Sequence, residues 1–265
     1  MSRPAETCDA SKTGDASESG DASKAGPRQA AERSLAAIRD AHTDRPYVVA
    51  QLGQSLDGRI ATVSGDSRWI NGDDALDHLH ALRAAVDAVV VGVGTVVADD
   101  PQLTVRRVYG THPVRVVIDP SGRAPQHARC FAADGTARYA ILAGDTVAGG
   151  NTVRSDGVQQ IILPRAGEQI CPREIVSRLF ALGMRRILVE GGADTISRFI
   201  NAGAVYRLHV LVAPIILGSG RPGLELAPIT FVAQAMRPAA AMHVFPDGDV
   251  LFDCDLRHRC DPATA

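Results

Sequence analysis

Residues 88–100 read AVVVGVGTVVADD, and this stretch decides the fold class. Ala88 and the valines after it form a continuous apolar run, the pattern of a strand that is covered on both faces of a parallel sheet. The run ends at Gly92 and Gly94, where the missing side chains let the backbone turn sharply or approach a ligand closely. A strand, a glycine turn and the start of a helix in succession predict one unit of an α/β sheet.

The same signals recur on both sides of this stretch. Short β-branched runs predict strands, spaced apolar residues predict helices, and Pro-Asp-Gly between two apolar runs predicts a hairpin. Asp73 or Asp74 is placed to cap one helix. Strands are expected at 47–52, 59–62, 88–91, 114–118, 138–142, 160–163, 187–189, 242–245 and 250–252, a long apolar run lies at 208–217, and helices are expected at about 31–41, 73–85, 172–182 and 193–202. This order predicts a single α/β domain over residues 45–258, with a mostly parallel sheet and a C-terminal antiparallel hairpin.

Residues 1–30 differ in composition from the rest of the chain. They are rich in serine, alanine, glycine and aspartate, and the tetrapeptide GDAS occurs at 14–17 and again at 20–23. Such a segment buries too little apolar surface to offset the entropy lost on ordering. We therefore expect a disordered low-complexity tail.

Charge and hydropathy exclude several kinds of partner. The chain has 28 lysine and arginine residues and 30 aspartate and glutamate residues, a balance that argues against electrostatic binding to nucleic acid or an anionic membrane. No apolar run approaches the ~20 residues of a membrane helix, and the N-terminus lacks the apolar core of a signal peptide. The five cysteines include no C-x-x-C pair, which argues against a zinc finger or a zinc deaminase. We expect a cytoplasmic protein without a metal.

Two glycine turns follow predicted strands and are candidates for nucleotide binding. The turn at 92–95 leads into a helix N-terminus, where phosphate binds well, but Val97 stands where a G-x-G-x-x-G motif has its third glycine. The sequence Glu190-Gly191-Gly192 follows another strand, at the end where ligands of open α/β sheets bind. Each turn also has an ordinary interpretation: a tight turn after a strand, and a glycine turn with a solvated glutamate.

Three other side chains stand out from their surroundings. Arg83 falls one turn after Leu79 on the apolar side of its helix, so it is expected to be partly buried and to need an anion. That anion is either a ligand or a structural partner from among Asp77, Asp87 and Asp99. Trp69, the only tryptophan, is either a core aromatic or part of a site, and Arg106 taken alone is a surface charge.

These pieces occur together, and in this order, in one family. The segments are VVAQLGQSLDGRIAT, GDSRWING, HALR, VDAVVVGVGTVVADDPQLTVR, PVRVVID, RRILVEGGADTISRFI and YRLHVLVAPIILG. Over about residues 46–256 the chain resembles the reductase domain of bacterial riboflavin-biosynthesis deaminase–reductases, as a stand-alone protein. The resemblance implies a fold like that of dihydrofolate reductase, with helices on both faces of the sheet.

The resemblance also implies a reaction and its partners. Members of this family use NADPH to reduce the ribosyl group of 5-amino-6-(5-phosphoribosylamino)uracil, or of its diamino-pyrimidinone analogue, to a ribityl group. The implied substrate is therefore a small phosphorylated pyrimidine. The deaminase half of the family is missing from this sequence, so a separate deaminase is expected, and the family implies a homodimer.

The matching segments imply site residues. Glu190 is implied as the catalytic residue, because its carboxylate can hydrogen-bond the sugar and orient the reacting carbon. Substrate contacts are implied at Gln51, Ser67, Arg83, Leu103 (by its backbone), Arg106 and Glu190, where the two arginines suit a 5′-phosphate. Cofactor contacts are implied at Gly53, Trp69, Thr95, Asp99 and the run from Gly192 to Ser197, which includes Ala193, Asp194 and Thr195, and the glycine turns add Gly92, Gly94 and Gly191.

The sequence departs from the family at three places. Gln51 stands where the family usually has lysine, Asn71 stands where it often has threonine, and Pro120 follows Asp119 where a small hydroxyl residue is common. The missing lysine removes a cation near the sugar, so a reductase of another pterin- or pyrimidine-like substrate remains an alternative. Ser121 and Arg123 follow and are candidate partners for the 2′-phosphate of the cofactor.

A third reading is a nucleotide-binding protein without catalytic activity. Glu190, Arg83 and Arg106 count against it, because a protein that only binds a nucleotide has no need of both ends of a substrate site.

Overall fold

The computed structural model describes residues 27–42, 44–144, 151–167 and 169–257. Its helices are α1 (Pro27–Arg39), α2 (Asp73–Ala85), α3 (Val93–Asp99), α4 (Pro172–Ala181) and α5 (Ala193–Asn201). Its strands are β1 (Tyr47–Ser55), β2 (Arg59–Thr62), β3 (Ala88–Gly92), β4 (Val114–Ile118), β5 (Arg138–Gly144), β6 (Asn151–Val153), β7 (Gln159–Ala166), β8 (Gln169–Ile170), β9 (Arg186–Glu190), β10 (Arg207–Ala213), β11 (Gly220–Pro222), β12 (Ala239–Val244) and β13 (Val250–Asp255).

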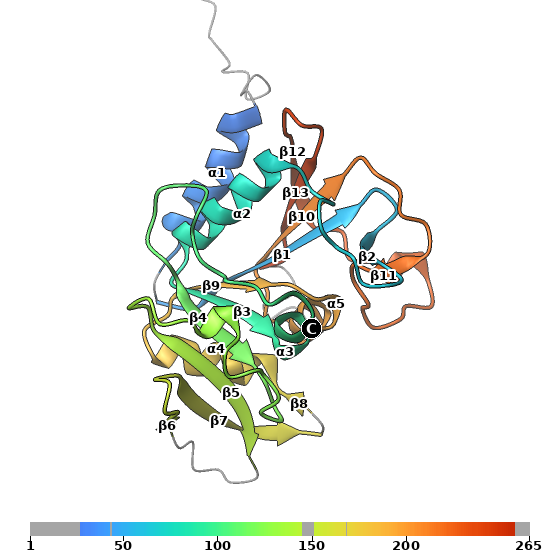
Figure 1. Cartoon of the computed structure of the whole chain (residues 1–265). Coiled ribbons are helices and arrows are strands. Elements are labelled where there is room, and N and C mark those ends of the chain that lie inside the picture. The colour runs from blue at the N-terminus through green and yellow to red at the C-terminus, as the bar shows by residue number, and fades with distance from the viewer. Residues whose placement is uncertain (1–26, 43, 145–150, 168, 258–265) are drawn as a thin grey trace, which may run out of the picture.

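One large sheet runs through the molecule (Figure 1). Its strand order is β12-β13-β10-β1-β9-β3-β4-β5-β7-β6, and β8 pairs with β7. Neighbours from β10 to β7 run parallel, whereas β12, β13, β6 and β8 pair antiparallel. The expected architecture, a mostly parallel sheet with a C-terminal antiparallel pair, is confirmed.

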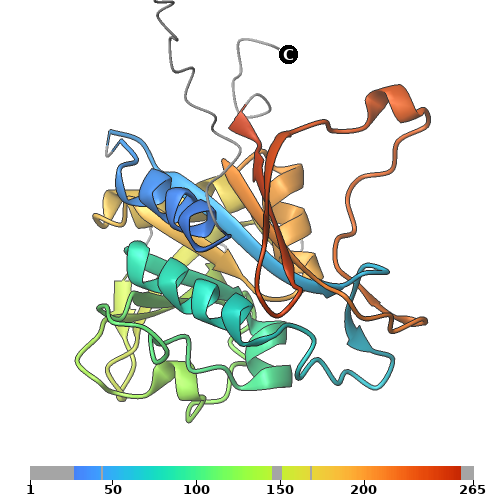
Figure 2. The ribbon, with the colours of Figure 1, turned by 90° about the horizontal axis from the view of Figure 1, so that it is seen from above.

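Helices cover both faces of this sheet, which is what the resemblance implies. Val48 and Ala50 of β1 belong to the apolar core on the face covered by α4 and α5, together with Ile175 and Phe199. Val49 belongs to the core on the opposite face, which α1, α2 and α3 cover. Figure 2 shows α1 and α2 lying side by side on that face. Because successive strand residues point to opposite faces, β1 is apolar at each of these positions.

A two-stranded sheet of β2 and β11 lies beside the large sheet (Figure 1). Asp57 ties the turn between β1 and β2 to the segment before β11. Its carboxylate accepts hydrogen bonds from the Ser55 hydroxyl at 2.6 Å and from the backbone N–H groups of Leu217 and Gly218. The hydrogen bond from Ser55, followed by those from the backbone, lowers the pKa of Asp57 to about 2. This turn fixes the small sheet beside the ends of the parallel strands.

Helix α2 has the expected bounds but not the expected cap. The N-terminal cap residue is Gly72, and neither Asp73 nor Asp74 caps the helix with its side chain. The turn between β12 and β13 supplies the acceptors instead: Gly72 N–H donates to Asp249 at 2.9 Å, and Asp74 N–H donates to Asp247 at 3.0 Å. The prediction was wrong because these carboxylates come from a hairpin far along the chain, which takes the place of a local cap.

Helix α1 begins earlier than the sequence predicts. It starts at Pro27, inside the 1–30 segment that was expected to be disordered, and residues 1–26 lie outside the described residues. Leu35 and Ile38 are buried against the sheet. The folded unit therefore includes residues that precede the expected boundary at 45. Among the described residues, no helix is long and apolar enough to cross a membrane.

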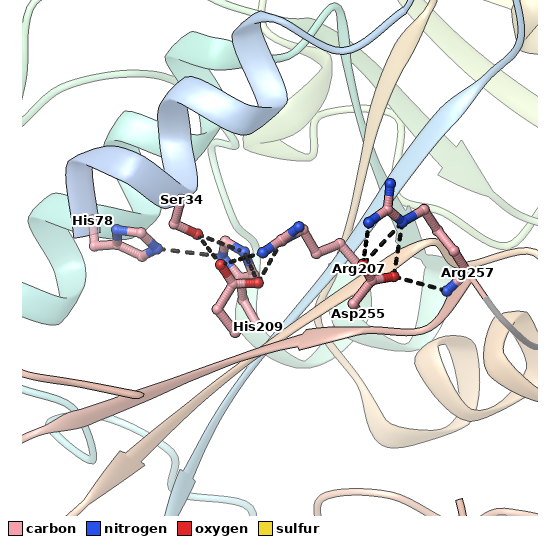
Figure 3. A network of polar contacts seen from close by, with 7 residues as sticks. Ser34, His78, Arg207, His209, Asp255 and Arg257 are labelled. Atoms are coloured by element: carbon pink, nitrogen blue, oxygen red, sulfur yellow. Dashed lines mark hydrogen bonds and ion pairs between the residues drawn. The ribbon is translucent and has the colours of Figure 1, made fainter. Parts of the chain in front are cut away.

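A buried polar network joins α1 to the sheet (Figure 3). Ser34 of α1 donates a hydrogen bond to Asp253 of β13 at 2.6 Å, and its hydroxyl lies 3.1 Å from Nε2 of His209 on β10. Nε2 of His78 on α2 lies 3.3 Å from Nδ1 of His209, and Arg207 donates hydrogen bonds to Asp253 from Nε and Nη2. The network connects two helices to two strands on the side of the sheet that carries α1 and α2.

Candidate active site

A cleft with a volume of about 870 Å³ crosses the carboxyl ends of the parallel strands. Strands β9 and β3 are neighbours and both end in this cleft, and the helices that follow them lie on opposite faces of the sheet. Helix α3 follows β3 and packs Val96 on one face, whereas α5 follows β9 and packs Ile196 on the other. Where successive connections leave to opposite faces, an open α/β sheet leaves a crevice that binds ligands.

The two glycine turns lie against each other in this crevice. Gly192 N–H donates a hydrogen bond to the Thr95 hydroxyl at 3.0 Å. A Cβ at Gly191, where φ is +90°, would lie 2.8 Å from Oγ1 of Thr95, and a Cβ at Gly92 would lie 2.3 Å from Oγ1 of Thr195. Glycine is therefore required at both turns by close contact, and at Gly191 also by backbone conformation. The ordinary tight-turn interpretation accounts for one turn at a time but not for this pairing.

Every residue that the sequence analysis named individually for the cofactor lines the cleft. These residues are Gly53, Trp69, Gly92, Gly94, Thr95, Asp99, Gly191, Gly192, Ala193, Asp194 and Thr195. The run from Gly192 was expected to continue to Ser197, but Ser197 is buried and its hydroxyl accepts a hydrogen bond from Glu225 N–H at 2.8 Å. That the listed cleft residues contact a cofactor remains a prediction.

Trp69 is not a core aromatic, so that alternative was wrong. Its side chain is 86% exposed and its φ is +65°, a left-handed conformation that a bulky residue rarely adopts. It lines the cleft from the loop between β2 and α2. An exposed indole at the cleft is available to contact a ligand.

Glu190 and Gln51 stand together at one end of the cleft. They are register partners on the neighbouring parallel strands β9 and β1. Both are buried, and both line the cleft, as does the half-buried Ser67. Asn71 closes this end beside Gly53, with its Nδ2 donating to Asp249 at 3.0 Å. Two of the three departures from the family pattern, Gln51 and Asn71, therefore line the same cleft as the predicted catalytic residue.

Arg83 has a partner that the sequence analysis did not name. Its Nε and Nη2 donate to the two carboxylate oxygens of Glu190, each at 2.7 Å, and both side chains are buried. Burial opposes the charge of Arg83, but the adjacent Glu190 raises its pKa. The three aspartates proposed as partners are not used: Asp77 pairs with Arg107 and Asp87 with Arg186, while Asp99 lines the cleft.

Leu103 and Arg106 lie on a loop at 100–113 that has neither helix nor strand. Leu103 is 1% exposed and adopts a φ of +58°. Arg106 is exposed, and its Nη1 donates to the Thr104 hydroxyl at 2.8 Å, while the Thr104 carbonyl accepts a hydrogen bond from Arg83. Arg83, Leu103 and Arg106 are not among the residues that line the cleft itself. Arg83 contacts Glu190 directly, and Arg106 is connected to Arg83 through Thr104.

The far end of the cleft is basic. Ser121 and Arg123, which follow β4, line it, and so do Arg165 of β7 and Arg198 of α5. The sequence analysis missed Arg165 and Arg198, because no local pattern brings β7 and α5 to the same cleft. Asp119 is buried and is not among the residues that line the cleft, and its carboxylate accepts the backbone N–H groups of Arg123 and Ala124 at 3.0 and 2.8 Å.

A cleft at a switch point, paired glycine turns and a buried carboxylate define an α/β domain of the class that binds its ligands in a crevice across the strand ends. The chain belongs to the RibD C-terminal domain family, which matches residues 46–236.

Two relatives show how the match is distributed. The chain is 35% identical over 178 residues to the riboflavin biosynthesis protein RibD of Aquifex aeolicus, which is 67% of this chain and 49% of that protein. It is 34% identical over 177 residues to the 2,5-diamino-6-ribosylamino-4(3H)-pyrimidinone 5′-phosphate reductase of Methanothermobacter thermautotrophicus, which is 66% of this chain and 80% of that protein.

A solved structure shares the fold. The crystal structure of a diaminohydroxyphosphoribosylaminopyrimidine deaminase/5-amino-6-(5-phosphoribosylamino)uracil reductase from Thermotoga maritima matches with a TM-score of 0.67 and 26% identity. The match covers 80% of this chain and 56% of that one. The chain thus spans about half the length of the Aquifex and Thermotoga proteins.

Proposed function

We propose that this chain is an NADPH-dependent reductase of riboflavin biosynthesis. Its reaction would convert the ribosyl group of 5-amino-6-(5-phosphoribosylamino)uracil, or of its diamino-pyrimidinone analogue, into a ribityl group. The observation that carries the proposal is a cleft in which interlocked glycine turns lead to the buried carboxylate of Glu190. The family and the printed name of the Methanothermobacter relative support it.

The residues of the cleft fit a dinucleotide. Gly191 and Gly192 lead into α5, a nine-residue helix whose first N–H groups and dipole favour an anion. Gly94 has open space where a Cβ would stand, so its backbone can be approached closely. These residues would hold the pyrophosphate, and Trp69 would contact the cofactor at the cleft. When bound, the nicotinamide supplies the hydride.

The basic end of the cleft supports NADPH rather than NADH. Ser121, Arg123 and Arg165 would receive the 2′-phosphate, because guanidinium groups bind phosphate with paired hydrogen bonds. The nearby Asp119 is 2% exposed and is not among the residues that line the cleft, so it is not placed to hold an unphosphorylated ribose. We expect a clearly lower kcat/KM with NADH, and equal values for the two cofactors would contradict this assignment.

Glu190 would position the sugar. The ribosylamine must open before C1′ can accept a hydride, and opening exposes hydroxyl groups. Each oxygen of Glu190 accepts one hydrogen bond from Arg83, and a carboxylate oxygen has room for a second donor. Glu190 can therefore accept hydrogen bonds from the sugar while Arg83 holds it in place. Gln51, its register partner, supplies an uncharged amide where the family usually has a lysine.

Arg106 would bind the 5′-phosphate of the substrate. Its guanidinium is exposed and is held by Thr104 next to the ion pair of Arg83 and Glu190. Arg83 gives three of its five N–H groups to Glu190 and Thr104, which leaves it a smaller share in the phosphate contact. A homodimer and a cytoplasmic location belong to the same proposal.

The test is NADPH oxidation with the phosphorylated pyrimidine substrate. We expect turnover with this substrate and little with a pterin, and the reverse would favour a related reductase of another pathway, as Gln51 allows. NADPH binding without turnover on either substrate would indicate a non-catalytic nucleotide-binding protein. Growth of a riboflavin auxotroph that lacks only the reductase activity checks the same point in cells.

A further inference from the structure

Two consecutive backbone N–H groups of the loop at 100–113 donate to imidazole rings, one from α2 and one from the loop itself. Val105 N–H donates to Nδ1 of His112 at 3.2 Å, and Arg106 N–H donates to Nδ1 of His80 at 2.9 Å. A loop without helix or strand must place its backbone N–H groups on other acceptors. Two consecutive N–H groups therefore depend on histidine side chains from outside the 103–107 stretch.

His80 is built into the fold as a neutral acceptor. It lies on α2 and is 3% exposed. Because Nδ1 accepts the Arg106 N–H, the proton of the neutral ring is on Nε2. Burial, followed by the nearby charges of Arg83, Arg106 and Arg107, lowers the pKa of His80 to about 4, although Asp77 opposes this. The ring is therefore an uncharged acceptor throughout the neutral pH range.

The loop that His80 holds also contacts Arg83, the ion-pair partner of Glu190. The Thr104 carbonyl accepts a hydrogen bond from Arg83 at 3.2 Å, and the Thr104 hydroxyl accepts one from Arg106 at 2.8 Å. Displacement of the Arg106 backbone would move Thr104 as well, since only one residue separates them in the chain. His80 thus connects α2, which carries Arg83, to the loop that carries Arg106.

We propose that His80 is a positioning residue of the substrate site, which holds the 103–107 loop so that Arg106 faces the 5′-phosphate. This proposal rests on the proposed function. His78, two residues earlier on the same helix, faces the network of His209 and Asp253 instead. The two histidines are both buried, so they allow a comparison between loss of a site contact and loss of a core contact.

The experiment compares three variants of the full chain. His80→Ala removes the acceptor, and His80→Asn offers an amide oxygen near the position of Nδ1. His78→Asn is the matched control for loss of a buried histidine on α2. The readouts are KM for the phosphorylated substrate, the Kd of NADPH, and hydrogen exchange of the Arg106 amide measured by NMR.

We expect His80→Ala to raise KM about threefold to tenfold, the effect of one hydrogen bond, with the NADPH Kd unchanged. His80→Asn should recover most of this, and His78→Asn should leave KM near wild type while lowering Tm. The Arg106 amide should exchange faster in His80→Ala alone. The proposal is overturned if His80→Ala keeps the wild-type KM, or if His80→Asn and His78→Asn raise KM as much as His80→Ala does.

The exchange measurement separates this proposal from the proposed function. If the wild type does not turn over the pyrimidine, the proposed function is wrong and the substrate part of this proposal is overturned with it. Faster exchange of the Arg106 amide in His80→Ala would still establish that His80 holds the loop. Equal exchange in all variants would overturn the holding contact itself, whatever the substrate.

Discussion

Two buried carboxylates in this protein each accept hydrogen bonds from Nε and Nη2 of one arginine, and only one of the carboxylates lines the cleft. Glu190 receives Nε and Nη2 of Arg83, each at 2.7 Å, and Asp253 receives Nε and Nη2 of Arg207 at 2.5 and 2.9 Å. Both acids are at most 5% exposed. By ion pairing and burial alone the two pairs cannot be told apart.

The difference lies in the remaining acceptor capacity. Asp253 also accepts a hydrogen bond from Ser34, and Nε2 of His209 lies 3.3 Å from its other oxygen, so each oxygen has two donors. Among the described residues, the hydrogen bonds to the carboxylate of Glu190 come from Arg83 alone, one to each oxygen, and Glu190 lines the cleft. A saturated carboxylate holds a fold together, whereas one with free lone pairs at a cleft can bind a ligand. Access and unused acceptor sites therefore identify the functional acid.

Removal of either arginine gives the largest expected effect. Arg83→Ala and Arg207→Ala should each lower the free energy of unfolding by about 3–5 kcal/mol, because each leaves an unpaired buried carboxylate. Urea denaturation measures this loss. Catalytic activity per folded molecule then distinguishes the two ion pairs. Arg207→Ala should keep this activity, and Arg83→Ala should lose it. An inactive but fully folded Arg207→Ala variant would mean that the two networks are coupled.

The histidines around Asp253 predict a pH dependence of stability. Burial, and next the neighbouring His209, lower the pKa of His78 from 6.5 to about 3. Between these pH values the unfolded chain binds a proton that the folded protein does not, so stability falls as the pH drops below about 6.5. The loss should be roughly 1.4 kcal/mol per pH unit from this group.

The substitution His78→Gln checks this pH dependence, since it keeps a polar group near His209 but does not titrate. The slope of unfolding free energy between pH 6.5 and 4.5 should become smaller in this variant. The carboxylate of Asp253 affects the free energy of unfolding in a different pH range. Burial alone would raise the pKa of Asp253, but hydrogen bonds from His209, Arg207 and Ser34 hold it well below the usual range. Its contribution is therefore lost only below about pH 4. An unchanged slope in His78→Gln would contradict the assignment to His78.

Most of the sheet could be predicted because each strand carries its own signal. The apolar run at Ala88 and the glycines after it are local features, and β3 begins at the predicted residue and ends at Gly92, one residue after the predicted end. Contacts between distant segments could not be predicted. The hydrogen bonds that cap α2 go to Asp247 and Asp249, which are 173 and 177 residues from the groups that they cap.

In the site, too, features with a local sequence signal could be predicted and contacts between distant segments could not. The glycine turns were predictable, since a glycine after a buried strand is a local signal of close backbone approach. The partner of Arg83 was not, because Glu190 is 107 residues away and is adjacent only once the sheet has formed. The local aspartates near Arg83 were the obvious candidates, but Asp77 and Asp87 pair with other arginines. The basic end contributed by Arg165 and Arg198 escaped for the same reason.

Glu190→Gln separates the two carboxylates by function. The amide keeps the shape but loses the charge, so kcat should fall about tenfold to a hundredfold, the worth of a charged hydrogen bond. The substrate KM should change less. The matched variant Asp253→Asn should lower Tm and leave kcat/KM of the folded protein unchanged. Steady-state kinetics and thermal melts on both variants check this, and equal kcat values for Glu190→Gln and wild type would remove Glu190 from the catalytic role.

The smallest expected effect concerns Arg106, the exposed member of the substrate end. Arg106→Ala should lower kcat/KM for the phosphorylated substrate about tenfold, near the lower end for a charged hydrogen bond because water screens an exposed guanidinium. Arg106→Lys should recover part of this, since an ammonium cannot form the paired contact. Arg107→Ala is the control, because the adjacent arginine is occupied by Asp73 and Asp77 on the helix surface. Kinetics with phosphorylated and dephosphorylated substrate decide the assignment. If Arg106→Ala discriminates between these substrates as well as the wild type does, Arg106 is a surface charge and the phosphate is bound elsewhere.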